Sequence, residues 1–117
     1  MLICREFTFD AAHHLTEYKG KCENVHGHTY KLRVCIEEEV KDNGLAFDFV
    51  ELKSIVNKKI IDVLDHTDLN KRFDQPSCEN IVIWIWDTLS EDLKLAEVWL
   101  WESPDTFVVY KPGGAGR

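Results

Sequence analysis

The sequence lacks three features that would indicate a membrane, secreted or nucleic-acid-binding protein. It has no apolar run that approaches the about 20 residues of a membrane-spanning helix, and its first residues, Met1 to Glu6, contain no hydrophobic signal region. No run of lysine or arginine interrupts the net charge of -7, so the chain repels nucleic-acid phosphates and anionic membranes. We therefore predict a cytoplasmic protein with no nucleic-acid and no membrane partner.

Cysteine is sparse and irregularly placed. The four cysteines form no CxxC pair and no dense disulfide framework, and they stand at Cys4, Cys22, Cys35 and Cys78. Reduced thiols fit this spacing best, and Cys4, Cys35 and Cys78 can serve as small buried hydrophobic residues. Cys22 differs from the others because it lies only four residues before His26.

The residues that are present indicate one small globular domain. Of 117 residues, 44% are hydrophobic and 30% are charged, the balance of an ordinary globular protein. We treat residues 1–117 as a single domain in which the glycine-rich residues 113–117 form a frayed tail. Four tryptophans and six phenylalanines are more than so small a domain buries alone, which favours an oligomer.

Alternating apolar and polar residues predict four strands. Residues 2–14 and 30–40 follow the period of two that is typical of a sheet with one buried face. A second pair of strands is expected around the turn residues Pro104 and Asp105, at 97–101 and 106–110.

Two helices are predicted between these pairs of strands. Asp48 can cap a helix whose apolar residues repeat about every 3.6 positions as far as Val63. The apolar run 81–86 suits a buried strand as well as a buried helix. Ser77 just upstream and Glu79 in the first turn favour the helix.

Three histidines form a candidate metal site. His26 and His28 flank Gly27, and the period of a strand places both imidazoles on one face. If the first two strands pair as a hairpin, His13 at the end of the first strand lies beside them. Three neutral nitrogen ligands leave Zn²⁺ an open position, as in a catalytic rather than a closed structural site. Scattered histidines without a metal are also compatible with this spacing.

Cys22 lies within a loop's reach of these histidines and has two interpretations. A nearby cation lowers the pKa of a thiol and raises its thiolate fraction, so Cys22 can act as a base or nucleophile. It can equally be a fourth, structural metal ligand, which would close the site. Spacing alone does not separate the two.

Two acidic features complete the candidate set. Asp65 and His66 are adjacent after the first predicted helix and suit a proton relay, although neighbours in sequence need not touch. Glu102 ends a predicted strand, where a carboxylate is usually solvated. A buried carboxylate at that position can bind the amino and ring N–H groups of a guanine-like base with both oxygens.

Together, these motifs resemble those of one known family. The matching stretches run in order along residues 7–110, namely Phe-Asp-Ala-Ala-His at 9–13, Cys22 before His-Gly-His at 26–28, Leu-Asp-His at 64–66, Pro-Ser-Cys-Glu-Asn at 76–80, and Glu102. They are similar to the 6-pyruvoyltetrahydropterin synthase and 6-carboxytetrahydropterin synthase family. The resemblance implies an α+β tunnelling fold, a four-stranded antiparallel sheet with two helices on one face in the order β-β-α-α-β-β. It also implies a trimeric barrel, and a homohexamer of two trimers with active sites at subunit interfaces.

The resemblance further implies a role for each candidate residue. It implies three zinc ligands, which are His13, His26 and His28. It implies a proton-transfer set, in which Cys22 is the base and the relay consists of Asp65 and His66. It implies a pterin-binding set, which is Glu102, Glu79 and Ser77.

The substrate implied is a small-molecule pterin, 7,8-dihydroneopterin triphosphate, on which zinc would act as a Lewis acid. One branch of the family eliminates triphosphate to form a pyruvoyl product. The other releases acetaldehyde and leaves a 6-carboxy group, in the biosynthesis of 7-deazaguanines such as queuosine. The three-residue gap between Cys22 and His26 resembles the second branch, so we predict a lyase that forms 6-carboxy-5,6,7,8-tetrahydropterin. A non-catalytic zinc and pterin-binding domain is the rival, but binding alone needs no proton-transfer set.

Glu23 follows Cys22 directly, and the resulting Cys-Glu-x-x-His-Gly-His loop resembles a dual-function subtype. Relatives with glutamate in place of the cysteine form 6-hydroxymethyldihydropterin for folate synthesis. A carboxylate and a thiolate in adjacent positions differ in basicity and reach, so each can take a different proton. Adjacent residues on an extended loop also point opposite ways, in which case Glu23 is a surface charge.

Overall fold

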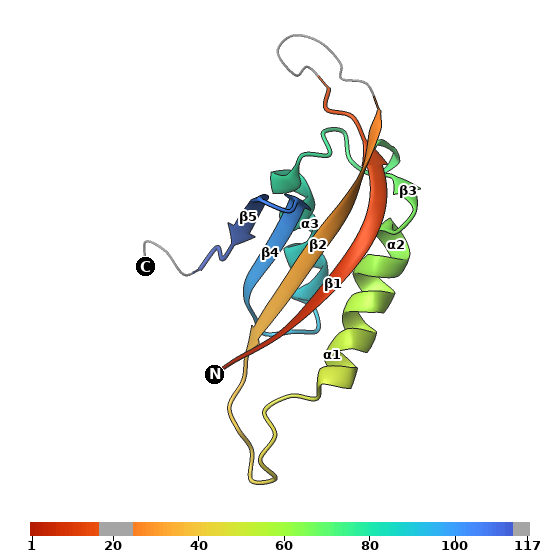
Figure 1. Cartoon of the computed structure of the whole chain (residues 1–117). Coiled ribbons are helices and arrows are strands. Elements are labelled where there is room, and N and C mark those ends of the chain that lie inside the picture. Colours follow the sequence, from red (N-terminus) through yellow and green to blue (C-terminus); the bar gives the residue numbers. More distant parts are fainter. Residues whose placement is uncertain (17–24, 114–117) are drawn as a thin grey trace.

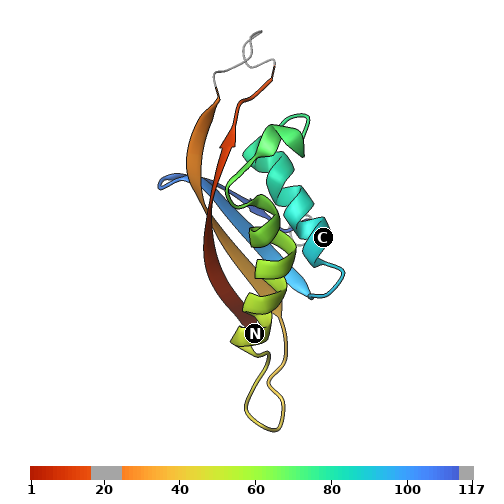
Figure 2. The same ribbon diagram turned by 90° about the vertical axis from the view of Figure 1, so that its right-hand side faces the viewer.

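The computed structural model describes residues 1–16 and 25–113. One sheet forms a layer with the strand order β3-β1-β2-β4-β5, and the helices cover one of its faces (Figures 1 and 2). Within these residues, no helix combines the length and the apolar character needed to cross a membrane.

The first two strands form the long antiparallel hairpin that the sequence predicts. β1 (Leu2–His13) pairs with β2 (His26–Glu37) in a register that places Leu2 opposite Glu37 and His13 opposite His26. β2 therefore begins at the His-Gly-His motif, as the metal-site argument expects, and it ends earlier than the predicted 30–40 pattern. Its first residues are polar, and the alternation of apolar residues does not reveal them.

β4 (Leu95–Ser103) pairs with β2, and β5 (Thr106–Tyr110) pairs with β4, both antiparallel. Four residues of β2 and β4 that face the helices are fully buried, namely Leu32, Val34, Val98 and Leu100. Because the strands alternate, the opposite face of the sheet carries charged and aromatic side chains that include Arg33, Trp99 and Trp101.

The first predicted helix is confirmed, but it contains a wider turn. α1 (Phe49–Val56) continues into the π-helical segment η1 (Asn57–Ile61) and then into α2 (Asp62–Leu64). Asp48 caps it, since its Oδ1 accepts a hydrogen bond of 2.8 Å from the Val50 N–H.

The buried residues of this helix are spaced by four, at Leu52, Val56, Ile60 and Leu64. A regular α-helix turns by about 100° per residue, so a four-residue spacing drifts by about 40° at each step. The π segment takes up part of this drift because its turn is wider. Phe49, which follows the apolar pattern in the sequence, is 56% exposed at the helix start.

The helix prediction for residues 81–86 is also confirmed. α3 (Cys78–Leu89) begins after Ser77, whose hydroxyl accepts a hydrogen bond of 3.2 Å from the Asn80 N–H. Its apolar face packs on the sheet through four fully or almost fully buried residues, Ile81, Val82, Ile85 and Leu89.

One strand was not predicted. β3 (Thr67–Asp68) runs parallel to β1 and pairs with Ala11 and Ala12 at the outer edge of the sheet, before the 3-10 turn η2 (Leu69–Lys71). The four predicted antiparallel strands are thus joined by a fifth, parallel one. Two residues are too few to show a period, so the sequence pattern cannot reveal such a strand.

The prediction that Cys4 is a buried hydrophobic residue is wrong. Cys35 and Cys78 are buried, at 2% and 7% exposure, but Cys4 is exposed. Its side chain lies on the face of β1 that points away from the helices, because the neighbouring odd-numbered residues of β1 face the core.

Candidate active site

Two of the predicted metal-binding histidines meet at one end of the sheet. His13 ends β1 and His28 lies near the start of β2, and their imidazole rings stack with centroids 4.8 Å apart. His13 is only 1% exposed. The backbone of His26 pairs with His13, and the position of the His26 side chain lies outside the described part of the structure.

Glu102 of β4 joins these histidines. Its Oε1 atom lies 3.4 Å from Nε2 of His28 and 3.8 Å from Nε2 of His13. Two imidazole nitrogens and a carboxylate oxygen that lie within 4.8 Å of one another form a candidate metal-binding group. Nitrogen and oxygen donors of this kind fit Zn²⁺.

Tyr30 orients one of the rings. Its hydroxyl lies 2.6 Å from Nδ1 of His13, which leaves Nε2 of the same ring directed at the Glu102 carboxylate. A ligand histidine typically uses its second nitrogen in this way to fix ring orientation. Burial, followed by the nearby Glu102 charge, raises the pKa of Tyr30 well above its usual value, so the phenol stays protonated.

Sequence reasoning missed Tyr30, although a signal was present. Tyr30 stands two residues after His28, and the period of a strand places both on one face. The hydroxyl of a tyrosine on the ligand face of a strand can form a hydrogen bond with a neighbouring imidazole.

The predicted relay pair is in contact at the outer edge of β1. Nδ1 of His66 lies 3.0 Å from Oδ2 of Asp65. The backbone of Asp10 holds both residues: its N–H donates to Oδ1 of Asp65 at 2.9 Å, and its carbonyl accepts from the His66 N–H at 2.6 Å. The Asp10 N–H lowers the pKa of Asp65, and His66 lowers it further.

Asp10 is a second residue that the sequence did not single out. Its side chain accepts a hydrogen bond of 2.5 Å from the Thr29 hydroxyl across the hairpin. The carboxylates of Asp10 and Asp65 and the His66 imidazole lie within 4.8 Å of one another. The position of the Asp65–His66 turn beside Asp10 depends on the packing of the helix, which the sequence pattern does not specify.

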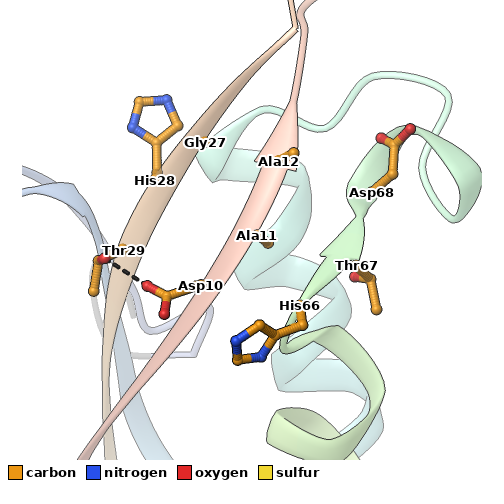
Figure 3. Close-up of a pocket in the computed structure, with 9 residues that line it drawn as sticks. All are labelled: Asp10, Ala11, Ala12, Gly27, His28, Thr29, His66, Thr67 and Asp68. Atoms are coloured by element: carbon orange, nitrogen blue, oxygen red, sulfur yellow. Dashed lines mark hydrogen bonds between the residues drawn. The ribbon is translucent and has the colours of Figure 1, made fainter.

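A pocket of about 530 Å³ lies between His28 and the cluster of Asp10, Asp65 and His66. Its lining includes His28 from β2, Asp10 from β1 and His66 from the segment that enters β3. Figure 3 shows β1 running between His28 on one side and His66 on the other. The pocket is thus lined by one residue of the histidine–glutamate cluster, His28, and by Asp10 and His66 of the other cluster.

The remaining predicted site residues lie elsewhere or outside the described residues. The Ser77 hydroxyl caps α3, and Glu79 is exposed in the first turn of that helix. Their roles in substrate binding stay predictions. Cys22 and Glu23 lie outside the described residues, and their roles also stay predictions.

Comparison with known proteins agrees with this fold. The family model described as 6-pyruvoyl tetrahydropterin synthase matches residues 2–113. A 6-carboxy-5,6,7,8-tetrahydropterin synthase of Haemophilus influenzae is 36% identical over an alignment 137 residues long, which covers 93% of this chain and 97% of that protein. A dihydroneopterin monophosphate aldolase of Pyrococcus furiosus is 40% identical over 99 residues, which cover 81% of this chain and 83% of that protein.

The fold likewise matches a solved structure. The 6-pyruvoyl tetrahydropterin synthase of Caenorhabditis elegans superposes with a TM-score of 0.84 at 28% identity, and the match covers 95% of this chain and 94% of that one. The α+β tunnelling fold is confirmed by this likeness. The chain therefore belongs to the 6-pyruvoyl tetrahydropterin synthase family, whose members are lyases.

Proposed function

We propose that this protein is a zinc-dependent 6-carboxy-5,6,7,8-tetrahydropterin synthase. Its substrate would be 7,8-dihydroneopterin triphosphate, and its products 6-carboxytetrahydropterin, acetaldehyde and triphosphate. The observation that carries the proposal is the convergence of His13, His28 and Glu102 beside a pocket that also reaches His66. The Haemophilus relative, named for the carboxy-forming activity, supports this branch of the family.

His13 and His28 would hold the metal, with His26 as the third ligand. Their donor chemistry fits zinc, and the Tyr30 hydroxyl already fixes which nitrogen of His13 faces the site. A bound zinc ion would supply a Lewis acid that polarises an oxygen of the substrate side chain.

Glu102 would bind the pterin ring through paired charge-assisted hydrogen bonds. Its carboxylate also lies close to the Nε2 atoms of His13 and His28, so it is placed to become a metal ligand. Glu102→Gln separates the two roles. If Glu102 anchors the pterin, the variant keeps its zinc and its substrate affinity falls by roughly 2 kcal/mol. As a metal ligand, it binds zinc more weakly.

Proton transfer would fall to Cys22 on one side and His66 on the other. Asp65 contacts Nδ1 of His66, so Nε2 is the atom that can exchange a proton with the substrate. The two hydrogen bonds from the Asp10 backbone hold this pair at the edge of the pocket. The role of Asp65 is to orient the imidazole and to stabilise its charged form.

The test is to incubate purified protein with 7,8-dihydroneopterin triphosphate and to identify the products by mass spectrometry. We expect 6-carboxytetrahydropterin together with acetaldehyde. A pyruvoyl product would place the enzyme in the other branch, and absence of turnover by the zinc-loaded protein would favour a binding domain. Cys22→Ala should keep its zinc and lose product formation; loss of zinc would make Cys22 a ligand instead.

A second activity, side-chain cleavage to 6-hydroxymethyldihydropterin, is favoured by one specific observation. The Pyrococcus furiosus relative is named an aldolase that acts on dihydroneopterin monophosphate, and this chain has Glu23 beside Cys22. If Cys22 is needed for the carboxy product and Glu23 for the hydroxymethyl product, Cys22→Ala retains the hydroxymethyl product and loses the carboxy product. Glu23→Ala then does the reverse. If the unaltered protein forms no hydroxymethyl product from dihydroneopterin or its phosphates, Glu23 is a surface charge.

A further inference from the structure

Two cysteines face each other across the β1–β2 hairpin, away from the site described above. Cys4 of β1 is the direct cross-strand partner of Cys35 of β2, and both thiols are free. Directly opposed residues of antiparallel strands have Cα atoms about 4.5 to 5.5 Å apart. A disulfide needs a Cα separation of about 4.4 to 6.8 Å, so this register meets its main geometric condition.

The two thiols differ in their surroundings. Cys4 is exposed, whereas Cys35 is 2% exposed between Cys4 on one side and Glu97 of β4 on the other. Burial, followed by the neighbouring Cys4 side chain, raises the pKa of Cys35 to about 12. Cys35 therefore keeps its proton, while Cys4 is the thiol that a reagent can reach.

We propose that Cys4 and Cys35 form a redox modification site whose reactant is a small disulfide, such as an oxidised low-molecular-weight thiol. The Cys4 thiolate attacks one sulfur of the small disulfide and releases one thiolate. The Cys35 sulfur, on losing its proton, then attacks the Cys4 sulfur of the mixed disulfide and releases the second thiolate. The protein loses two electrons and two protons, and the small disulfide is reduced to two thiols.

The cross-link would join the two strands near the N-terminal end of β1. The histidine cluster lies at the opposite end of the same hairpin, where His13 pairs with His26 (Figure 1). Oxidation would therefore fix the register of the two strands that supply the histidines. The cross-link itself would not contact the site.

The test uses the full chain, reduced and then incubated with oxidised glutathione. Free thiols are alkylated under denaturing conditions, and the protein is examined by intact mass and peptide mapping. We expect a peptide pair linked through residues 4 and 35, a loss of about 2 Da for the two hydrogens, and complete reversal by a dithiol reductant. A glutathione adduct that persists on Cys4, with Cys35 still open to alkylation, would overturn the proposal, as would an unmodified pair.

Single variants test the order of the two steps. Cys35→Ser should accumulate the mixed disulfide on Cys4, because the second step is missing. Cys4→Ser should leave Cys35 unmodified in the folded protein, because that thiol is buried and protonated. Cys78→Ser is the matched control and should form the 4–35 link like the unaltered chain. Modification of Cys35 in the Cys4→Ser protein at an equal rate would contradict the proposed order.

Discussion

At the scale of single residues, Tyr30 determines how one candidate ligand is presented. Its hydroxyl contacts Nδ1 of His13, so Tyr30→Phe removes the partner and leaves the ring shape nearly unchanged. We expect zinc affinity to fall by about 10- to 100-fold, as for other partners of ligating histidines. Competition with a chromophoric chelator measures this affinity. Tyr110→Phe on β5 is the control, and equal affinities of the two variants would remove Tyr30 from the site.

His66 is held in a backbone conformation that is unfavourable for it. Its φ is +59°, in the left-handed region that only glycine adopts without cost. His66→Gly should therefore be more stable than His66→Ala, by about 1 kcal/mol. Urea unfolding of the two variants measures the difference. Equal stabilities would show that the turn relaxes to another conformation once the imidazole is gone.

At the scale of elements, the hydrogen bonds of Asp65 connect the turn after α2 to β1. They lower its pKa below the ordinary value of 3.8, so its carboxylate stabilises the fold above that value. This contribution is lost as the pH falls through the lower pKa of the folded state. Asp65→Asn should thus be less stable than the unaltered chain at neutral pH, and the difference should shrink below about pH 4. A stability difference independent of pH, measured by urea unfolding, would contradict this.

The parts of the fold that were predicted depend on local signals. Asp48 and Ser77 cap the helices at the positions that the sequence indicates, and the hairpin brings His13 to His28 because its strands are neighbours in the chain. The approach of Glu102 to these histidines was not predictable in this way. It requires β4 to pair with β2 after two intervening helices, and no local pattern specifies that pairing.

At the scale of the whole molecule, the described residues of one chain leave sheet edges and an aromatic face uncovered. Among residues 1–16 and 25–113, β3 covers β1 only at Ala11 and Ala12, and β5 is an edge strand. On the face away from the helices, Trp99, Trp101 and Phe107 stack at centroid distances of 5.2 to 5.6 Å, and Phe107 is 48% exposed. Uncovered edges and apolar faces of this kind favour association between chains.

We therefore expect the homohexamer that the resemblance implies, with active sites at the interfaces between subunits. Sedimentation equilibrium should give six times the mass of one chain at the concentrations used for activity assays. A monomer that retains full activity would contradict both the assembly and the shared sites.

The π-helical segment has a consequence for the length of the chain. Its turn closes on the fifth residue rather than the fourth, which is the geometry of a regular helix that has received one insertion. Removing Lys58, an exposed residue of the segment, should let the helix close regularly between Asp48 and Asp65, with its buried side still on the sheet. Deletion of Glu51 instead removes a residue from α1, which has no wide turn that could compensate for the loss. We expect the first shortened chain to fold and the second to be strongly destabilised, as thermal unfolding followed by circular dichroism would show; equal losses would contradict it. Related chains can therefore differ by one residue here and still bring an imidazole to the same edge of the sheet.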